Sequence, residues 1–142
     1  RDSDNGQAMQ RLLGDVQKVI DEMKEDDEII SSMAEKLEKE VTTLSEVTLW
    51  LGSRMLEGEL VDASAAASPY LKMFGQVLGG YYMGKAAMLA NKKFKETNDE
   101  FYSDKLTLSK FYIEQLLPLT SGYASAVTAG KEDLYAMKAE NF

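Results

Sequence analysis

The chain has 142 residues, 44% hydrophobic and 28% charged, which is enough for one globular domain with its own core. It contains no cysteine and no histidine, which excludes disulfides, thiolate chemistry, Cys- or His-based metal sites and a histidine general base. The net charge of −8 argues against binding to a nucleic-acid backbone, which needs clustered lysine and arginine.

We expect a single helical domain over residues 1–142, located in the cytoplasm. The sequence starts at Arg1 with neither a methionine nor a signal-like apolar run. A processed chain fits this start, but a C-terminal fragment of a longer protein is the simpler expectation.

The first predicted helix follows four residues that favour helix starts. Asp-Ser-Asp-Asn at 2–5 can accept hydrogen bonds from the unpaired first amides, so we expect a helix from about Gly6 to Met23. Its apolar residues recur at steps of three and four: Met9, Leu12, Val16, Val19, Ile20 and Met23.

Six acids and one lysine occupy residues 21–28. Acids oppose the dipole at a helix C-terminus and favour it at an N-terminus, which predicts a break near Glu25–Asp27. A calcium-binding loop is the functional alternative, but the alternating acids, turn glycine and terminal glutamate of such a loop are missing. A solvated corner between two helices is therefore favoured.

The second predicted helix runs from about Glu28 to Leu56, and Gly58 marks its end. We expect Glu35, Lys36, Glu38, Lys39 and Glu40 to face away from the core, with Glu35–Lys39 as an i,i+4 pair and Trp50 covering the seam. A strict 3.5-residue period would also suit a coiled coil. The apolar stripe comprises Ile30, Met33, Leu37, Val41, Leu44, Val47 or Thr48, Leu51 and Met55.

Residues 59–68 are rich in alanine and remain open between helix and loop. We favour a helix from near Asp62, bent around Pro69 and continuing to about Lys95. Three lysines, Lys92, Lys93 and Lys95, suit its C-terminus because they complement the helix dipole. A phosphate site is the alternative function for these lysines.

Pro69–Ala90 is the stretch around which we expect the chain to be organised. Apolar residues recur at helical spacing, at Leu71, Phe74, Leu78, Tyr81 or Tyr82, and Met88 or Leu89. Gly75 and Gly79 are one turn apart, as are Gly80 and Gly84, so we expect two flat strips that let a neighbouring backbone approach closely. A membrane span is the alternative, but Lys72 and Lys85 fall inside the window and are expensive in a bilayer.

The fourth predicted helix runs from about Glu100 to Thr128, after a connection and cap at Thr97–Asp99. Pro118 should bend it near Glu114, and Gly130 should end it. The tail Lys131–Phe142 is expected to dock as a short helix. The predicted apolar face comprises Phe101, Leu108, Phe111, Tyr112, Leu116, Leu119, Tyr123 and Val127. Four such helices with short connections predict an all-α, antiparallel up-and-down four-helix bundle.

The sequence contains no phosphate loop, dinucleotide fingerprint or nucleophile elbow. Asp104 and Glu114 are acid–base candidates without a recognisable partner, and a solvated or interfacial edge is favoured for Glu114. Tyr81, Tyr82 and Tyr112 could stack on a flat ligand, but core or interface positions are commoner. We therefore assign no catalytic, cofactor-binding or metal-binding residue.

Three blocks of the sequence resemble a known domain. They are Pro69–Gly75 with the Gly79–Gly80 pair, Phe101–Lys105 through Phe111–Pro118, and Thr128–Leu134. In this order they resemble the extra C-terminal helical domain of a subgroup of bacterial acyl-CoA dehydrogenases, which includes the methylmercaptopropionyl-CoA enzymes. The resemblance covers residues 4–137.

The resemblance implies a parent enzyme that uses FAD to remove hydrogens from the α and β carbons of an acyl-CoA. A glutamate, usually in a Tyr-Glu-Gly-Thr stretch, takes the α proton in that subgroup, and this stretch is absent here. The implied role of the present chain is structural: packing on the catalytic body, setting a homo-oligomer or bordering the acyl-CoA entrance. A stand-alone helical interaction module is the alternative, and a catalytic fragment is a third reading.

Overall fold

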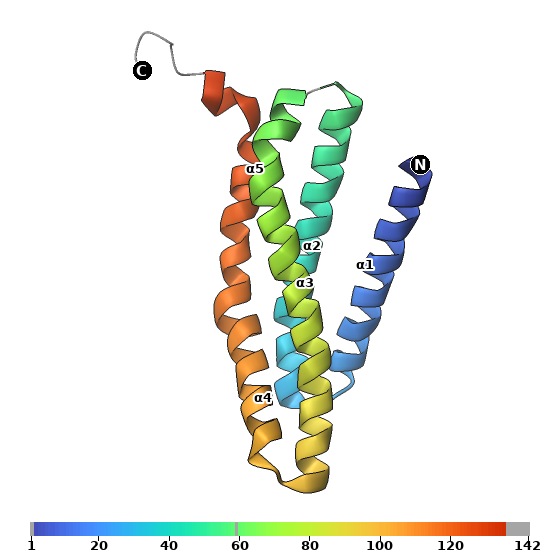
Figure 1. Cartoon of the computed structure of the whole chain (residues 1–142), viewed down its shortest axis with the longest axis vertical. Helices are drawn as coiled ribbons and strands as arrows, with labels where there is room; N and C mark the ends of the chain where they lie inside the picture. Colours follow the sequence, from blue (N-terminus) through green and yellow to red (C-terminus); the bar gives the residue numbers. More distant parts are fainter. Residues whose placement is uncertain (1, 59, 136–142) are drawn as a thin grey trace.

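The computed structural model describes the backbone of residues 2–58 and 60–135, and the side chains of residues 7–58 and 66–129. Within these ranges the regular structure is entirely helical, so the predicted all-α class is confirmed. The elements are α1 (Asp2–Lys24), α2 (Glu28–Leu56), α3 (Leu60–Thr97), α4 (Glu100–Phe111), η1 (Tyr112–Leu116), η2 (Leu117–Leu119) and α5 (Thr120–Tyr135). Helices α4 and α5, with the two short turns between them, form one continuous rod (Figure 1).

Helix α3 is the central element, as the sequence predicts. It packs along α2, α4 and α5 and also contacts α1. Helix α1 rests mainly on α2, and in the described part of the chain it has no comparable contact with α4 or α5. Figure 1 shows α1 leaning away from the other rods toward its N-terminus.

Two helices begin earlier than predicted. Helix α1 already begins at Asp2, so residues 2–5 lie in its first turn instead of preceding it. Helix α3 begins at Leu60 and continues through Pro69, so residues 60–68 are helical, while Glu59 lies outside the described residues. The corner at residues 25–27 and the end of α2 at Gly58, with φ of 81°, are confirmed.

Gly130 does not end the last helix, which continues to Tyr135. An isolated glycine costs a helix only about 1 kcal/mol, and the good helix formers around Gly130 offset that cost. Residues 131–135 therefore extend α5 and form no separate docked helix. The rest of the predicted tail, residues 136–142, lies outside the described residues.

Pro118 changes the hydrogen-bond pattern of the last rod, in line with the predicted disturbance near Glu114. Proline has no N–H to donate to the carbonyl of Glu114, four residues earlier. The chain responds with a π turn, in which the Leu117 N–H bonds to the Tyr112 carbonyl, followed by the 3₁₀ turn Leu117–Leu119. Asp99, as predicted, caps α4, and its Oδ1 accepts from the Phe101 N–H at 3.0 Å.

The core is formed by apolar side chains from all four rods. The predicted stripes of α1 and α2 are largely confirmed, although Met55 is 57% exposed. On α3 the buried positions are shifted from the predicted ones, because Met73, Val77 and Ala87 are buried whereas Leu71 and Leu89 are exposed. The cluster comprises Val16, Val19, Ile20, Met23, Ile30, Met33, Ala34, Leu37, Val41, Leu44, Val47, Ala66, Met73, Val77, Tyr81, Ala87, Ile113, Leu117 and Val127.

The glycines of α3 receive side chains and not, as predicted, a neighbouring backbone. A Cβ placed on Gly80 would lie 2.9 Å from Leu37 Cδ1 and 3.1 Å from Leu117 Cδ2. One placed on Gly84 would lie 2.8 Å from the sulfur of Met23, and one on Gly79 would strike the Tyr112 ring. Gly75 faces open space, so the predicted Gly75–Gly79 strip is not a packing surface.

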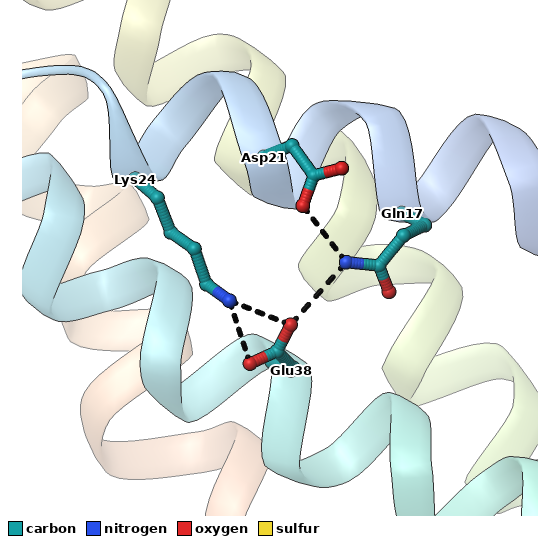
Figure 2. A network of polar contacts seen from close by, with 4 residues as sticks. All are labelled: Gln17, Asp21, Lys24 and Glu38. Carbon is teal, nitrogen blue, oxygen red and sulfur yellow. Dashed lines mark hydrogen bonds and ion pairs between the residues drawn. The ribbon is translucent and has the colours of Figure 1, made fainter.

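Polar side chains fasten α1 to α2 across the acidic corner (Figure 2). The Lys24 ammonium lies 2.8 Å from both carboxylate oxygens of Glu38, and Gln17 bonds to Asp21 at 2.9 Å and to Glu38 at 3.3 Å. The hydrogen bond raises the pKa of Lys24 and lowers the pKa of Glu38. Glu38 therefore faces α1 as well as solvent. Among the described side chains, Glu35 and Lys39 do not form the predicted ion pair.

Asp27 ties the same corner to α3. Its Oδ1 caps α2 through the Ile30 N–H, while its Oδ2 accepts from Asn91 at 2.7 Å and from Lys95 at 3.1 Å. The Asn91 amide, aided by Ile30 and Lys95, holds the pKa of Asp27 below its ordinary value. Asp27 therefore contributes stability at neutral pH that is lost as the pH falls through this lowered pKa.

Glu40 was predicted to face solvent but is buried. Its side chain is 4% exposed, and no described residue forms a hydrogen bond to its Oε2. Burial raises the pKa of Glu40, although Lys39 partly offsets the effect. The helical position of Glu40, three residues after Leu37 and four before Leu44, places it on the packed face of α2.

Glu40→Gln is expected to stabilise the chain at pH 7 by about 1 kcal/mol, because it removes a buried charge that lacks a full set of partners. The folded state binds the Glu40 proton more tightly than the unfolded state, so wild-type stability rises as the pH falls from the raised pKa toward the ordinary one. The advantage of the variant should therefore shrink at about pH 4. Urea unfolding at both pH values measures this, with Glu46→Gln, at an exposed position of α2, as the control. A less stable Glu40→Gln at pH 7 would contradict the prediction.

Candidate functional site

The last rod exposes five large apolar side chains, which we call the apolar stripe. Its members were predicted to face the core, and the structure contradicts this because each is at least 42% exposed. Exposed apolar side chains that gather along one element are typical of protein interaction sites. The stripe comprises Phe101 (56% exposed), Leu108 (55%), Phe111 (52%), Leu116 (42%) and Leu119 (66%).

The π and 3₁₀ turns keep the second half of this stripe aligned. A π turn takes an extra residue per turn, so the five-residue step from Phe111 to Leu116 comes close to one full turn. The 3₁₀ turn has three residues per turn, so Leu116 and Leu119 lie on the same side. In an uninterrupted α-helix these three positions would diverge around the rod.

The opposite face of the rod is held against α3 by two hydrogen bonds to one residue. The Tyr112 hydroxyl donates to the backbone carbonyl of Gln76 at 2.7 Å. The Thr120 hydroxyl donates to the side-chain Oε1 of Gln76 at 3.0 Å. Ile113 and Leu117 are fully buried between these contacts, so the rod cannot turn its apolar stripe inward.

The two acid–base candidates lie in different surroundings. Asp104 is exposed on α4. Glu114 forms an ion pair with Lys36 of α2 at 3.4 Å, and its side chain is 19% exposed, so the predicted interfacial edge is confirmed. Ten residues along a helical rod separate the two carboxylates by about 15 Å, too far for one reaction centre.

The three tyrosines do not form a common stacking site. Tyr81 is buried and its ring centroid lies 5.1 Å from that of the exposed Tyr82. Tyr112 covers Gly79 from the neighbouring rod, and burial raises the pKa of its hydroxyl. The expected core role therefore holds for Tyr81 and Tyr112.

Two of the three lysines near the C-terminus of α3 form ion pairs within the chain. Lys95 pairs with Asp27, and Lys93 lies 3.8 Å from Glu96. No group of three or more acids among the described residues has a geometry that could hold a metal ion. The helices in the described ranges also include none that is long and apolar enough to cross a membrane.

A family model described as acetyl-CoA dehydrogenase C-terminal like matches residues 12–138. The chain belongs to this family. It is therefore a helical domain of acyl-CoA dehydrogenase-like proteins, and the predicted resemblance is confirmed at the level of the domain. No curated protein matches the chain.

Two features of this dehydrogenase C-terminal-like domain were not predicted from the sequence. The exposed stripe was missed because apolar residues occur on both sides of the last rod, at Leu116 and Leu117 for example. The burial of Glu40 was missed because charged residues surround it in the sequence, but its i+4 relation to Leu44 was an available signal.

Proposed function

We propose that the chain is the C-terminal structural domain of an FAD-dependent acyl-CoA dehydrogenase, and that it has no catalytic residue of its own. We further propose that residues 1–142 form one domain, arranged as an antiparallel up-and-down bundle. The observation that supports the proposal is the family match over residues 12–138, together with an exposed apolar stripe that needs a partner surface. We call the longer protein the parent.

The parent would carry FAD, which accepts a hydride from the β carbon while a glutamate takes the α proton. The residues described here do not fit the flavin. The hollow between α1 and α3 is open to solvent, its walls carry lysines as well as the acids Glu22 and Asp26, and the sequence has no glycine-rich phosphate loop that would bind a pyrophosphate. We therefore place FAD, the acyl-CoA thioester and the catalytic glutamate in the rest of the parent.

The contribution of this chain is to dock on the catalytic body through the apolar stripe. Phe101, Phe111 and Leu119 supply rings and a branched side chain that gain free energy when they are removed from water. We propose that the parent is a bacterial, cytoplasmic homo-oligomer of the methylmercaptopropionyl-CoA subgroup. In that setting the docked domain would also help to set the subunit arrangement.

The docking role is tested in the full-length parent with Leu108→Asp/Phe111→Asp. We expect wild type to unfold in one cooperative calorimetric transition and the variant to unfold in two, because body and C-terminal domain lose their coupling. The melting temperature of the isolated 142-residue chain should change little, since both side chains are more than half exposed.

Leu49→Asp/Leu56→Asp is the matched control, because these residues of α2 are 76% and 92% exposed but lie outside the stripe. Identical single transitions in wild type, variant and control would reject docking through the stripe. The neighbouring reading frame tests the parent itself. A dehydrogenase body with a Tyr-Glu-Gly-Thr stretch upstream of Arg1 supports it, whereas a start codon there would favour the stand-alone interaction module.

A further inference from the structure

A groove runs between α1 and α3, and none of its lining residues belongs to the apolar stripe. Its volume is about 690 Å³, within the range of specific binding sites. Its lining residues come from the C-terminal half of α1, the turn that follows it and the second half of α3. Val19 of α1 and Met88 and Leu89 of α3 supply an apolar lining.

The two walls of the groove carry opposite charges. Lys85 and Lys92 are exposed on the α3 wall, seven residues and therefore two helical turns apart. Glu22 and Asp26 line the wall formed by α1 and the following turn. Leu89, one turn after Lys85, is 59% exposed although it belongs to the apolar lining.

From this arrangement we propose that the groove binds an amphipathic helix of a partner protein. The apolar face of that helix covers Val19, Met88 and Leu89. One of its edges carries acidic residues that face Lys85 and Lys92, and the other carries basic residues that face Glu22 and Asp26. Helix-in-groove recognition uses this combination of apolar anchors and charged edges.

The opposite charges of the walls favour this occupant over two others. An anionic amphiphile would be attracted by the lysines, but the carboxylates of Glu22 and Asp26 would repel its head group. A second copy of the chain would bring together two molecules with a net charge of −8 each. A helix with one acidic and one basic edge satisfies both walls at once.

The probe is a synthetic, fluorescently labelled helical peptide of about 14 residues, or four turns, stapled so that it is helical before it binds. It carries leucines along one face, glutamates along one edge and lysines along the other. Two control peptides carry glutamates on both edges or lysines on both edges. A peptide with its acidic and basic edges exchanged cannot serve as a control. It could bind along the groove in the reverse direction and so place its charges opposite the same walls.

We expect the mixed-edge peptide to bind the 142-residue chain and each control peptide to bind at least about tenfold more weakly. Leu89→Glu should weaken binding of the mixed-edge peptide by a similar factor, whereas Leu49→Glu, at an exposed position of α2, should not. Lys92→Glu should shift the preference toward the peptide with lysines on both edges. Circular dichroism confirms that each variant keeps the helical fold.

Equal binding of the three peptides, or binding that survives Leu89→Glu, overturns the proposal. Displacement of the mixed-edge peptide by dodecanoate at comparable concentration would instead identify an anion site. Sedimentation that shows a dimer lost in Leu89→Glu would identify a second copy as the occupant. A peptide that binds the 142-residue chain but not the full-length parent would show that the parent itself covers the groove.

Discussion

Gly79→Leu is expected to lower the free energy of unfolding by about 3 kcal/mol, because the new side chain occupies the space filled by the Tyr112 ring. The ring cannot move aside without losing the hydrogen bond from its hydroxyl to the Gln76 carbonyl. That loss outweighs the gain of about 1 kcal/mol in helix propensity when a glycine is replaced. Thermal unfolding should show a decrease of about 10 °C.

Gly75→Leu is the matched control, one turn earlier on the same helix. Apart from the neighbouring backbone of α3 itself, nothing lies within 4 Å of a Cβ built on Gly75, so this substitution should leave stability unchanged or raise it slightly. A double variant separates the packing effect from the propensity effect. In a Tyr112→Ala background, Gly79→Leu should lose most of its cost, and an equal cost in both backgrounds would show that Tyr112 is not the obstacle.

Leu37→Ala is expected to lower the free energy of unfolding by about 3 kcal/mol or more, through lost burial and the cavity it leaves. Leu37 is fully buried and reaches toward two glycines of α3. Its Cδ1 lies 2.9 Å from the position of a Cβ on Gly80, and its Cδ2 lies 3.5 Å from that of a Cβ on Gly84. Urea unfolding midpoints measure the loss.

Leu49→Ala controls for the removal of a leucine from α2, because Leu49 is 76% exposed and should change stability by less than about 0.5 kcal/mol. Gly80→Ala tests the contact from the other side. It should destabilise wild type, where its methyl group meets Leu37, and should cost less in Leu37→Ala, where that methyl group partly fills the cavity. Strict additivity of the two substitutions would argue against the contact.

The α1–α2 half of the fold was predictable because its helices have one apolar side each. Along α2 the apolar residues follow a single line from Ile30 to Val47, and most charges lie elsewhere around the helix. Periodicity then indicates both the helix and the buried face. The acidic corner was equally clear, because the helix dipole gives acids opposite effects at the two ends of a helix.

The buried face of the last rod was not predictable in the same way. Apolar residues occur there in adjacent pairs, such as Leu116–Leu117, so periodicity alone allows two different faces to be buried. Pro118 indicates that the α-helical hydrogen-bond pattern is interrupted. It does not specify whether the chain forms a kink or the observed π and 3₁₀ turns. Which side chains after Phe111 face the core depends on which of these two conformations the chain adopts.

The sequence by itself determined that this chain is helical, where its helices meet, and that the glycine-rich stretch forms the central one. Local propensity and spacing carry that information. Only the tertiary structure decided which side of the last rod is exposed, because the buried side is the one on which Tyr112 and Leu117 fit against the surface of α3. The same fit leaves the apolar stripe exposed, where a partner surface can reach it.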